Sequence, residues 1–219
     1  MTMEWPLLAS LTAEDRAAFL ALAKPRSFER GEIVCVAGDR ADGLHLVTDG
    51  RLAVHVSLAS GNTALINLLA RGDYFGELAL LVAGGRRTAS ITALERSETR
   101  VVSAVAFRAL CRERPSVERT LSVLLAHRVH ELSQRLIEAM HVGLEERLRR
   151  RLLELAEVYA AGGGPAVIPL TQAQLADMTG GTRPSVNIAL RSLVERGVVV
   201  LGRGKVTVVD PGRLAQSAS

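Results

Sequence analysis

A run of short apolar segments separated by turn residues occupies residues 27–105 and constrains the fold more than any other feature. Glycine next to aspartate marks most of the breaks, as in Gly38-Asp39, Asp49-Gly50 and Gly72-Asp73. Short segments at regular spacing with such turns predict the strands of a β-sandwich or barrel. The segments are 33–37, 44–47, 52–56, 64–69, 89–94 and 100–105.

Helical patterns flank this β region. Thr12 is placed to cap a helix over residues 11–23, which Lys24-Pro25 would end because the residue before proline disfavours the α region. A short helix is expected over 105–113, and a long one over 116–140. Alternating steps of three and four residues in the long helix predict a parallel coiled coil with a second copy of the chain. The seam positions are Ser122, Leu125, Val129, Leu132, Leu136, Ala139 and Gly143.

The last third of the chain has the pattern of a winged helix-turn-helix. Thr171-Gln172-Ala173-Gln174 is a capping-box sequence, which predicts a helix start. After Gly180-Gly181, Thr182 caps a second helix with Pro184 in its first turn. Two apolar runs around residues 202–205 then predict a β-hairpin, the wing. Residues 144–219 hold 10 basic and 7 acidic residues, against 17 and 16 before them, which favours a nucleic-acid partner for this part.

The segment Phe75-Gly76-Glu77-Leu78, followed by Arg86-Arg87-Thr88-Ala89, has the residues of an anion cradle. Backbone N–H groups at a helix start attract an anion, and an arginine can bind phosphate oxygens in bidentate fashion. Thr88 can donate a hydrogen bond, and Glu77 can accept one from a sugar hydroxyl. This combination predicts a site for a small phosphate ester attached to ribose.

Composition and spacing argue against several other classes. The chain has 219 residues, and each apolar run is interrupted by charge before it reaches membrane-span length. Its first ten residues lack the pattern of a signal peptide, so we expect a cytoplasmic protein. Cys35 and Cys111 are too far apart for a metal or cluster motif and could form a redox pair only if the fold brings them together. His127 and His130 lack an evident third ligand, and no pattern supports an enzyme such as a phosphodiesterase.

Taken together, these motifs resemble the Crp–Fnr superfamily of bacterial transcription regulators, in the form of the cyclic-AMP receptor proteins. Their cassette reads Phe-Gly-Glu-Leu and then Arg-Ser/Thr-Ala, and their recognition helix begins as Thr182-Arg183-Pro184-Ser185-Val186 does here. The resemblance implies an α+β fold: a cyclic-nucleotide-binding β-roll (a double-stranded β-helix), a long dimerisation helix, and a C-terminal winged helix-turn-helix. The corresponding domains are residues 1–114, 115–142 and 143–219.

The resemblance also implies site residues and partners. A cyclic nucleotide would bind in the β-roll and against the long helix, at Gly76, Glu77, Leu78, Ala79, Arg87, Thr88, Arg128, Leu132 and Ser133. Double-stranded DNA with a palindromic operator would meet Thr171, Thr182, Arg183, Pro184, Ser185, Asn187, Ile188 and Lys205. The resemblance further implies a homodimer and an interaction with RNA polymerase. Whether the protein activates or represses depends on where the operator lies relative to the promoter.

Three positions depart from the family pattern. Pro184 and Ile188 replace an acidic residue and an arginine that contact bases, which predicts a different half-site. Leu132 replaces a threonine that contacts the adenine. The resemblance implies cAMP as the effector, and the loss of this contact makes cGMP possible. The alternative is a regulator of the same fold that is constitutively active or responds to another effector, such as a redox signal or another small molecule.

Overall fold

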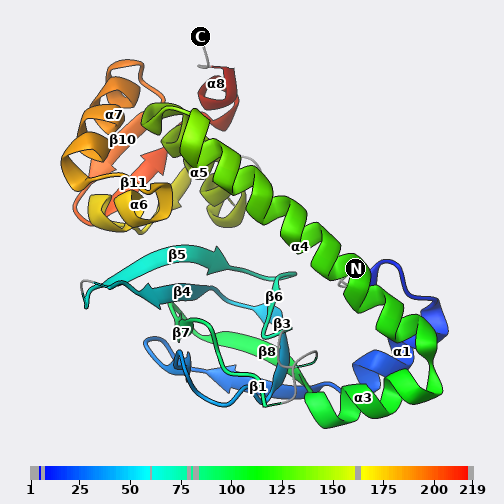
Figure 1. Cartoon of the computed structure of the whole chain (residues 1–219). Coiled ribbons are helices and arrows are strands. Elements are labelled where there is room, and N and C mark those ends of the chain that lie inside the picture. The colour runs from blue at the N-terminus through cyan, green and yellow to red at the C-terminus, as the bar shows by residue number, and fades with distance from the viewer. Residues whose placement is uncertain are drawn as a thin grey trace. The chain divides into compact units, whose positions relative to one another are not determined.

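The computed structural model describes residues 5, 8–59, 61–77, 80, 84–160 and 164–216. The chain divides into two compact units, residues 1–130 and residues 131–219, and the long helix α4 (Pro115–His141) runs through the boundary. Figure 1 labels the helices and strands of both units. Within the described residues, no helix has both the length and the apolar character needed to cross a membrane.

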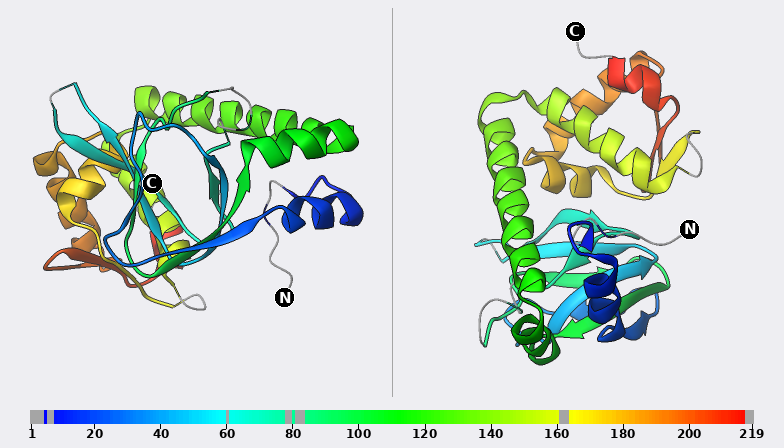
Figure 2. Two further views of the ribbon diagram at one scale, coloured as in Figure 1. Left: turned by 90° about the horizontal axis from the view of Figure 1, so that it is seen from below. Right: turned by 90° about the vertical axis from the view of Figure 1, so that its right-hand side faces the viewer.

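The first unit is built on two four-stranded antiparallel sheets, which face each other as a β-roll (Figure 2). One sheet has the order β1-β8-β3-β6, and the other has the order β2-β7-β4-β5. The strands are β1 (Lys24–Phe28), β2 (Ile33–Cys35), β3 (Gly43–Asp49), β4 (Leu52–Ser57), β5 (Thr63–Leu69), β6 (Tyr74–Phe75), β7 (Ser90–Ala93) and β8 (Ser97–Ser103).

The helices α1 (Ala13–Ala21) and α3 (Ala104–Glu113) lie together at one end of this roll (Figure 1). Thr12 caps α1 as predicted, because its side chain accepts from the Asp15 N–H. A core cluster joins Phe19 of α1 and Phe107 of α3 to Leu44 and Val102 of the first sheet. Trp5, the one tryptophan of the chain, is buried in the same cluster and donates its indole N–H to the Val47 carbonyl at 3.2 Å.

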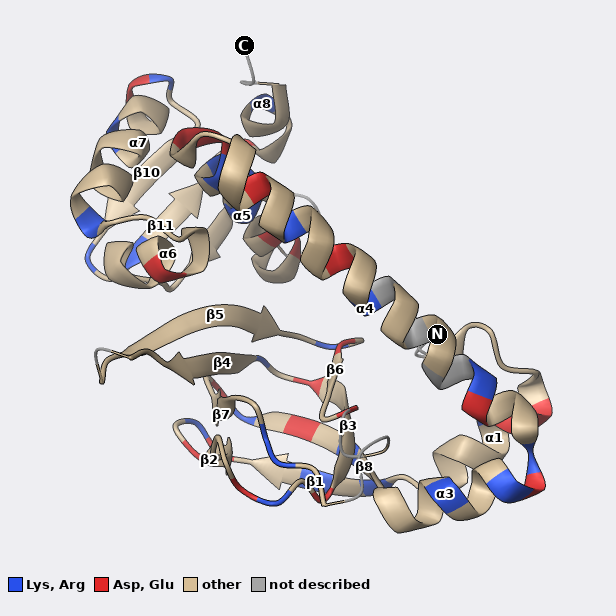
Figure 3. Ribbon diagram, viewed as in Figure 1, with Lys and Arg blue, Asp and Glu red and all other residues tan. Residues whose placement is uncertain are grey.

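Apolar side chains are exposed along α4, where a heptad seam is predicted. Val129, Leu132 and Leu136 are each more than half exposed in the single chain. Charged residues of both signs follow the same helix (Figure 3), as in Glu131 and Arg135. Val129, Leu132 and Leu136 form an apolar stripe on the exposed surface of the helix.

The second unit packs helices against a three-stranded sheet of order β10-β11-β9. Its elements are α5 (Leu144–Tyr159), β9 (Ala166–Ile168), α6 (Gln172–Thr179), α7 (Arg183–Glu195), β10 (Val199–Gly202), β11 (Lys205–Val208) and α8 (Pro211–Gln216). Arg149 of α5 is buried and donates to the carbonyls of Leu214 and Ala215, which ties α8 to the unit. Its guanidinium lowers the pKa of Glu146 to about 2.

Three elements were not predicted from the sequence. Strand β1 contains Pro25, which in the sequence indicates only the end of a helix. A proline is tolerated there because β1 is an edge strand. Strand β6 is two residues long, too short for a periodic pattern. Helix α8 is a single six-residue segment.

The two cysteines do not form a disulfide. Cys35 and Cys111 are both free, and each packs beside a different core cluster. Burial raises the pKa of both thiols, which keeps the reactive thiolate scarce at neutral pH.

Candidate ligand cradle and nucleic-acid interface

Gly76 is the position at which the cradle permits no side chain. It follows strand β6 with a φ of 83°, in the left-handed region that favours glycine. A Cβ built there would overlap Nη1 of Arg87 and would stand 2.5 Å from the carbonyl oxygen of Gly43. The bare backbone of Gly76 therefore lets the Arg87 guanidinium lie directly against the start of strand β3.

Arg87 is buried, and one of its two terminal nitrogen atoms is held by hydrogen bonds. Nη2 donates to the Gly43 carbonyl at 3.2 Å and to the carboxylate of Asp42. The guanidinium also lies over the Phe75 ring, 5.7 Å from its centroid. Nη1 is buried and has no hydrogen-bond partner among the described residues. A buried cationic N–H without an acceptor is costly, so this atom marks a place for an anion.

His45 lies against both Asp42 and the ring of Phe75. His45 is 1% exposed and stacks on Phe75 with ring centroids 4.4 Å apart. Its Nε2 lies 3.6 Å from Asp42 Oδ1, and its Nδ1 lies 3.2 Å from the Thr99 hydroxyl. The neighbouring His45 ring and Arg87 guanidinium hold the pKa of Asp42 well below its usual range. Burial lowers the pKa of His45, which favours the neutral ring.

The remaining cradle residues lie around this buried centre. Glu77 is half-buried and Thr88 is exposed. Leu78 and Ala79, together with most of the short helix expected after Gly76, lie outside the described residues. Arg86 is exposed and donates to the Gly38 carbonyl at 2.6 Å, so it joins two loops and leaves Arg87 as the arginine of the cradle.

The three residues expected to meet the nucleotide base are all on α4. Arg128 is half-buried and belongs to the first unit. Leu132 and Ser133 are exposed and belong to the second unit. Leu132, 55% exposed, presents an aliphatic side chain that can neither donate nor accept a hydrogen bond.

The second unit contains the helix-turn-helix. Thr171 and Gln174 form the predicted capping box at the start of α6, and Thr182 caps α7 by accepting from the Ser185 N–H at 3.3 Å. Gly180, with a φ of 64°, ends α6. A Cβ at Gly181 would stand 2.7 Å from the Leu144 side chain, so glycine allows α5 to approach the turn.

One face of α7 is buried and the other is presented to solvent. Val186, Ala189, Leu190 and Leu193 are buried in the unit. The predicted contact residues Thr182, Arg183, Pro184, Ser185 and Ile188 are exposed, and Ile188 is 71% exposed. This exposed side belongs to the N-terminal half of α7, the part that enters the major groove in helix-turn-helix proteins.

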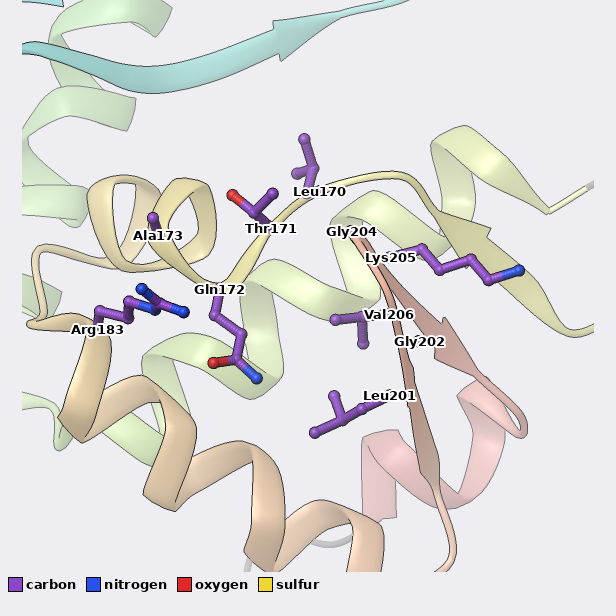
Figure 4. Close-up of a pocket in the computed structure, with 10 residues that line it drawn as sticks. All are labelled: Leu170, Thr171, Gln172, Ala173, Arg183, Leu201, Gly202, Gly204, Lys205 and Val206. Atoms are coloured by element: carbon purple, nitrogen blue, oxygen red, sulfur yellow. The ribbon is translucent and has the colours of Figure 1, made fainter.

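A pocket of about 420 Å³ lies between the start of α6, the start of α7 and the wing strands β10 and β11. Its polar lining comes from Thr171, Gln172, Arg183 and Lys205. The Arg183 side chain extends toward Gln172, while the Lys205 side chain points away from both (Figure 4). Arg183 at the start of α7 and Lys205 on the wing place two cations on the lining of this pocket, which is favourable for phosphate oxygens.

The structure adds Gln172, which the sequence reasoning did not include among the contact residues. Its Oε1 accepts from Nδ2 of Asn187 at 2.8 Å, so the first residue of α6 is bonded to the second turn of α7. The hydroxyls of Thr171 and Thr182 are already engaged in helix capping. A polar side chain at the first position of α6 was the available signal, but its partner, 15 residues later, is set by the packing of the two helices.

The fold and these two sites define a class of protein: a regulator with a sensor β-roll and a winged helix-turn-helix. Two family models match the chain, the cyclic nucleotide-binding domain over residues 25–114 and the Crp-like helix-turn-helix domain over residues 146–217. Within this class, the chain belongs to the Crp–Fnr family of transcription regulators, which are DNA-binding proteins and not enzymes. The class of effector that the sensor domain takes is a cyclic nucleotide.

Individual relatives align over almost the whole chain. The cyclic AMP receptor protein of Thermus thermophilus is 31% identical, with 97% of this chain and 96% of the relative covered. The CRP-like cAMP-activated global transcriptional regulator of Mycobacterium tuberculosis is 30% identical, with 93% of each covered. A solved structure of the c-di-GMP-responsive global regulator CLP of Xanthomonas campestris has a TM-score of 0.72 at 19% identity, over 91% of this chain and 99% of that one, and shares the fold.

Proposed function

We propose that this chain is a homodimeric regulator whose affinity for DNA is controlled by cAMP bound in the cradle of the first unit. The observation that carries the proposal is the buried Nη1 of Arg87, which has no acceptor among the described residues and lies against Gly76. A cyclic phosphate supplies the missing acceptor oxygens and one negative charge. The names of two relatives that align over nearly the full chain, both cAMP-linked, support this choice.

Each cradle residue has a role in this proposal. Arg87 pairs with the phosphate, and Thr88 adds a hydroxyl donor at its edge. The backbone at Gly76 approaches the phosphate closely because no Cβ intervenes. Glu77 accepts from the ribose hydroxyl, and Leu78 and Ala79 are further proposed contacts of the nucleotide.

The base is contacted from α4 by Arg128, Leu132 and Ser133. Ser133 can bond to the adenine edge, whereas Leu132 can only pack against the base. Because a site that bonds a base edge discriminates more strongly than one that packs on it, we expect weaker selection between adenine and guanine here.

We propose that the exposed apolar side chains of α4 are buried against the same helix of a second copy of the chain. Val129, Leu132 and Leu136 are 55–63% exposed and follow the predicted seam. Such a symmetric dimer would place two recognition helices on a palindromic operator, and the family resemblance adds RNA polymerase as a partner.

On the DNA, Arg183 is proposed to bind guanine O6 and N7 with two hydrogen bonds. Lys205 and Ser185 hold phosphates, and the caps at Thr171 and Thr182 bring helix N-termini toward the DNA backbone. Pro184 offers no donor, and Ile188 can contact only a thymine methyl. The half-site would therefore differ from that of relatives that carry an acidic residue and an arginine at these positions.

A second candidate is a regulator of the same fold with another effector, or with none. Leu132 favours it, because the aliphatic side chain strengthens an apolar seam while removing a polar contact to the base. The fold is shared with a c-di-GMP-responsive regulator, so that nucleotide belongs in the test.

Isothermal titration of the full chain with cAMP, cGMP and c-di-GMP separates these candidates. We expect heat with cAMP that is lost in Arg87→Gln, with Arg86→Gln as the matched control because Arg86 bonds a loop carbonyl outside the cradle. Binding of cAMP that is unchanged in Arg87→Gln would remove the cradle assignment. No heat with any of the three, alongside DNA binding in a fluorescence-anisotropy assay, would favour the effector-free candidate.

A further inference from the structure

The side-chain amides of Gln172, at the start of α6, and Asn187, in the second turn of α7, form a hydrogen-bonded pair. Nδ2 of Asn187 donates to Oε1 of Gln172 at 2.8 Å, and both side chains are half-buried. An amide has one acceptor oxygen and two N–H donors. The bond uses one donor of Asn187, so its carbonyl oxygen and its second N–H stay available for another partner.

The pair lies on the side of the unit that faces DNA in this family. Gln172 lines the pocket together with Arg183 and Lys205 (Figure 4). Asn187 follows Arg183 by four residues on α7, so the two side chains are neighbours on one helical face. The next residue, Ile188, is 71% exposed. Asn187 itself is half-buried, so part of its side chain is accessible beside Arg183.

We propose that Asn187 reads an adenine in the operator and that Gln172 is the positioning residue that holds it in the reading orientation. Adenine presents N7 as an acceptor and N6 as a donor, and an asparagine amide matches both with its N–H and its carbonyl oxygen. This contact uses the one N–H that Gln172 does not occupy. The two helices are thus coupled: α6 sets the orientation of a side chain with which α7 reads sequence.

The positioning role has a measurable size. A free asparagine must be immobilised when it binds a base, and holding it in advance removes that cost, about twofold to tenfold in affinity for one side chain. Loss of the reader itself should reduce discrimination at one base pair by about fivefold to a hundredfold. The effects of Gln172 and Asn187 concern the contact with DNA. They can therefore be measured whether or not the first unit binds a cyclic nucleotide.

The test begins with selection of bound duplexes from a random library by the full-length protein, with and without cAMP. Anisotropy titrations then measure wild type, Asn187→Ala, Gln172→Ala and the double variant on the selected site and on its single-base changes. We expect one position where adenine is preferred, a preference lost in Asn187→Ala and reduced about twofold to tenfold in Gln172→Ala. In the double variant, Gln172→Ala should have no further effect on base preference.

Two further variants separate positioning from simple damage. Gln172→Glu keeps an acceptor for the Asn187 N–H but adds negative charge near the phosphates, so it should keep the adenine preference while lowering affinity for all sequences. Gln216→Ala, an exposed glutamine on α8, should change nothing. A uniform loss across all bases in Asn187→Ala, an unchanged preference in both alanine variants, or a selection that yields no adenine at any position would overturn the proposal.

Discussion

Replacing Gly76 with alanine tests the close approach on which the cradle depends. Alanine at a φ of 83° costs about 1–2 kcal/mol from the backbone alone. The new Cβ would also overlap Arg87 Nη1 and stand 2.5 Å from the Gly43 carbonyl. Gly43 is paired with strand β8 and cannot retreat freely, so crowding adds about 1–3 kcal/mol. We therefore expect Gly76→Ala to reduce the free energy of unfolding by about 2–5 kcal/mol.

Gly31→Ala provides a matched control. Gly31 has a φ of 84°, almost the same as Gly76, but a Cβ there would meet nothing within 4 Å. This variant should therefore lose only the backbone contribution, about 1–2 kcal/mol. The difference between the two variants isolates the contacts with Arg87 and Gly43 from the strain that both share.

Fluorescence of Trp5 during urea unfolding is the assay, because the one tryptophan of the chain is buried in the first unit and reports on that unit. Gly76→Ala should unfold at a clearly lower urea concentration than Gly31→Ala, and a parallel titration should show weaker cAMP binding because Arg87 is displaced. Equal losses of stability in the two variants would refute the reasoning, since the cradle would then have room for a side chain.

Three other predictions concern separate parts of the chain. Burial lowers the pKa of His45, so the unfolded chain takes up its proton first as pH falls below about 6.5 and stability falls with it. His45→Phe, which keeps the stacking on Phe75, should flatten this pH dependence of the Trp5 transition, and an unchanged slope would contradict it. Arg149→Met should destabilise the second unit by about 1.5–3 kcal/mol, because charged hydrogen bonds to Glu146 and to α8 are lost. Hydrogen exchange in α5 and α8 measures it, and unaltered protection would contradict it. Leu136→Lys should shift sedimentation toward monomer, because it places a charge in the proposed apolar seam; a dimer of unchanged strength would place the interface elsewhere.

Much of the fold could be predicted because it is encoded locally. The capping box at Thr171 and the cap at Thr182 each depend on side chains within three residues, and both caps form as expected. The heptad pattern of α4 and the turn glycines of the β-roll can likewise be recognised from residues close together in the sequence. Strand β1 was missed because a proline in an edge strand reads as a break until the sheet that accepts it is known.

The sequence by itself determined most of the strands and helices and the helix-turn-helix, because these follow from periodicity, capping and glycine placement over a few residues. The cassette was identified from its resemblance to the family motif. Only the tertiary structure decided which side chains meet. The pairing of β3 with β6 sets His45 opposite Phe75, and the loop with Arg87 returns to Asp42, 45 residues earlier. The packing of α6 on α7 joins Gln172 to Asn187. Such contacts depend on strand register and helix packing, which local patterns do not specify.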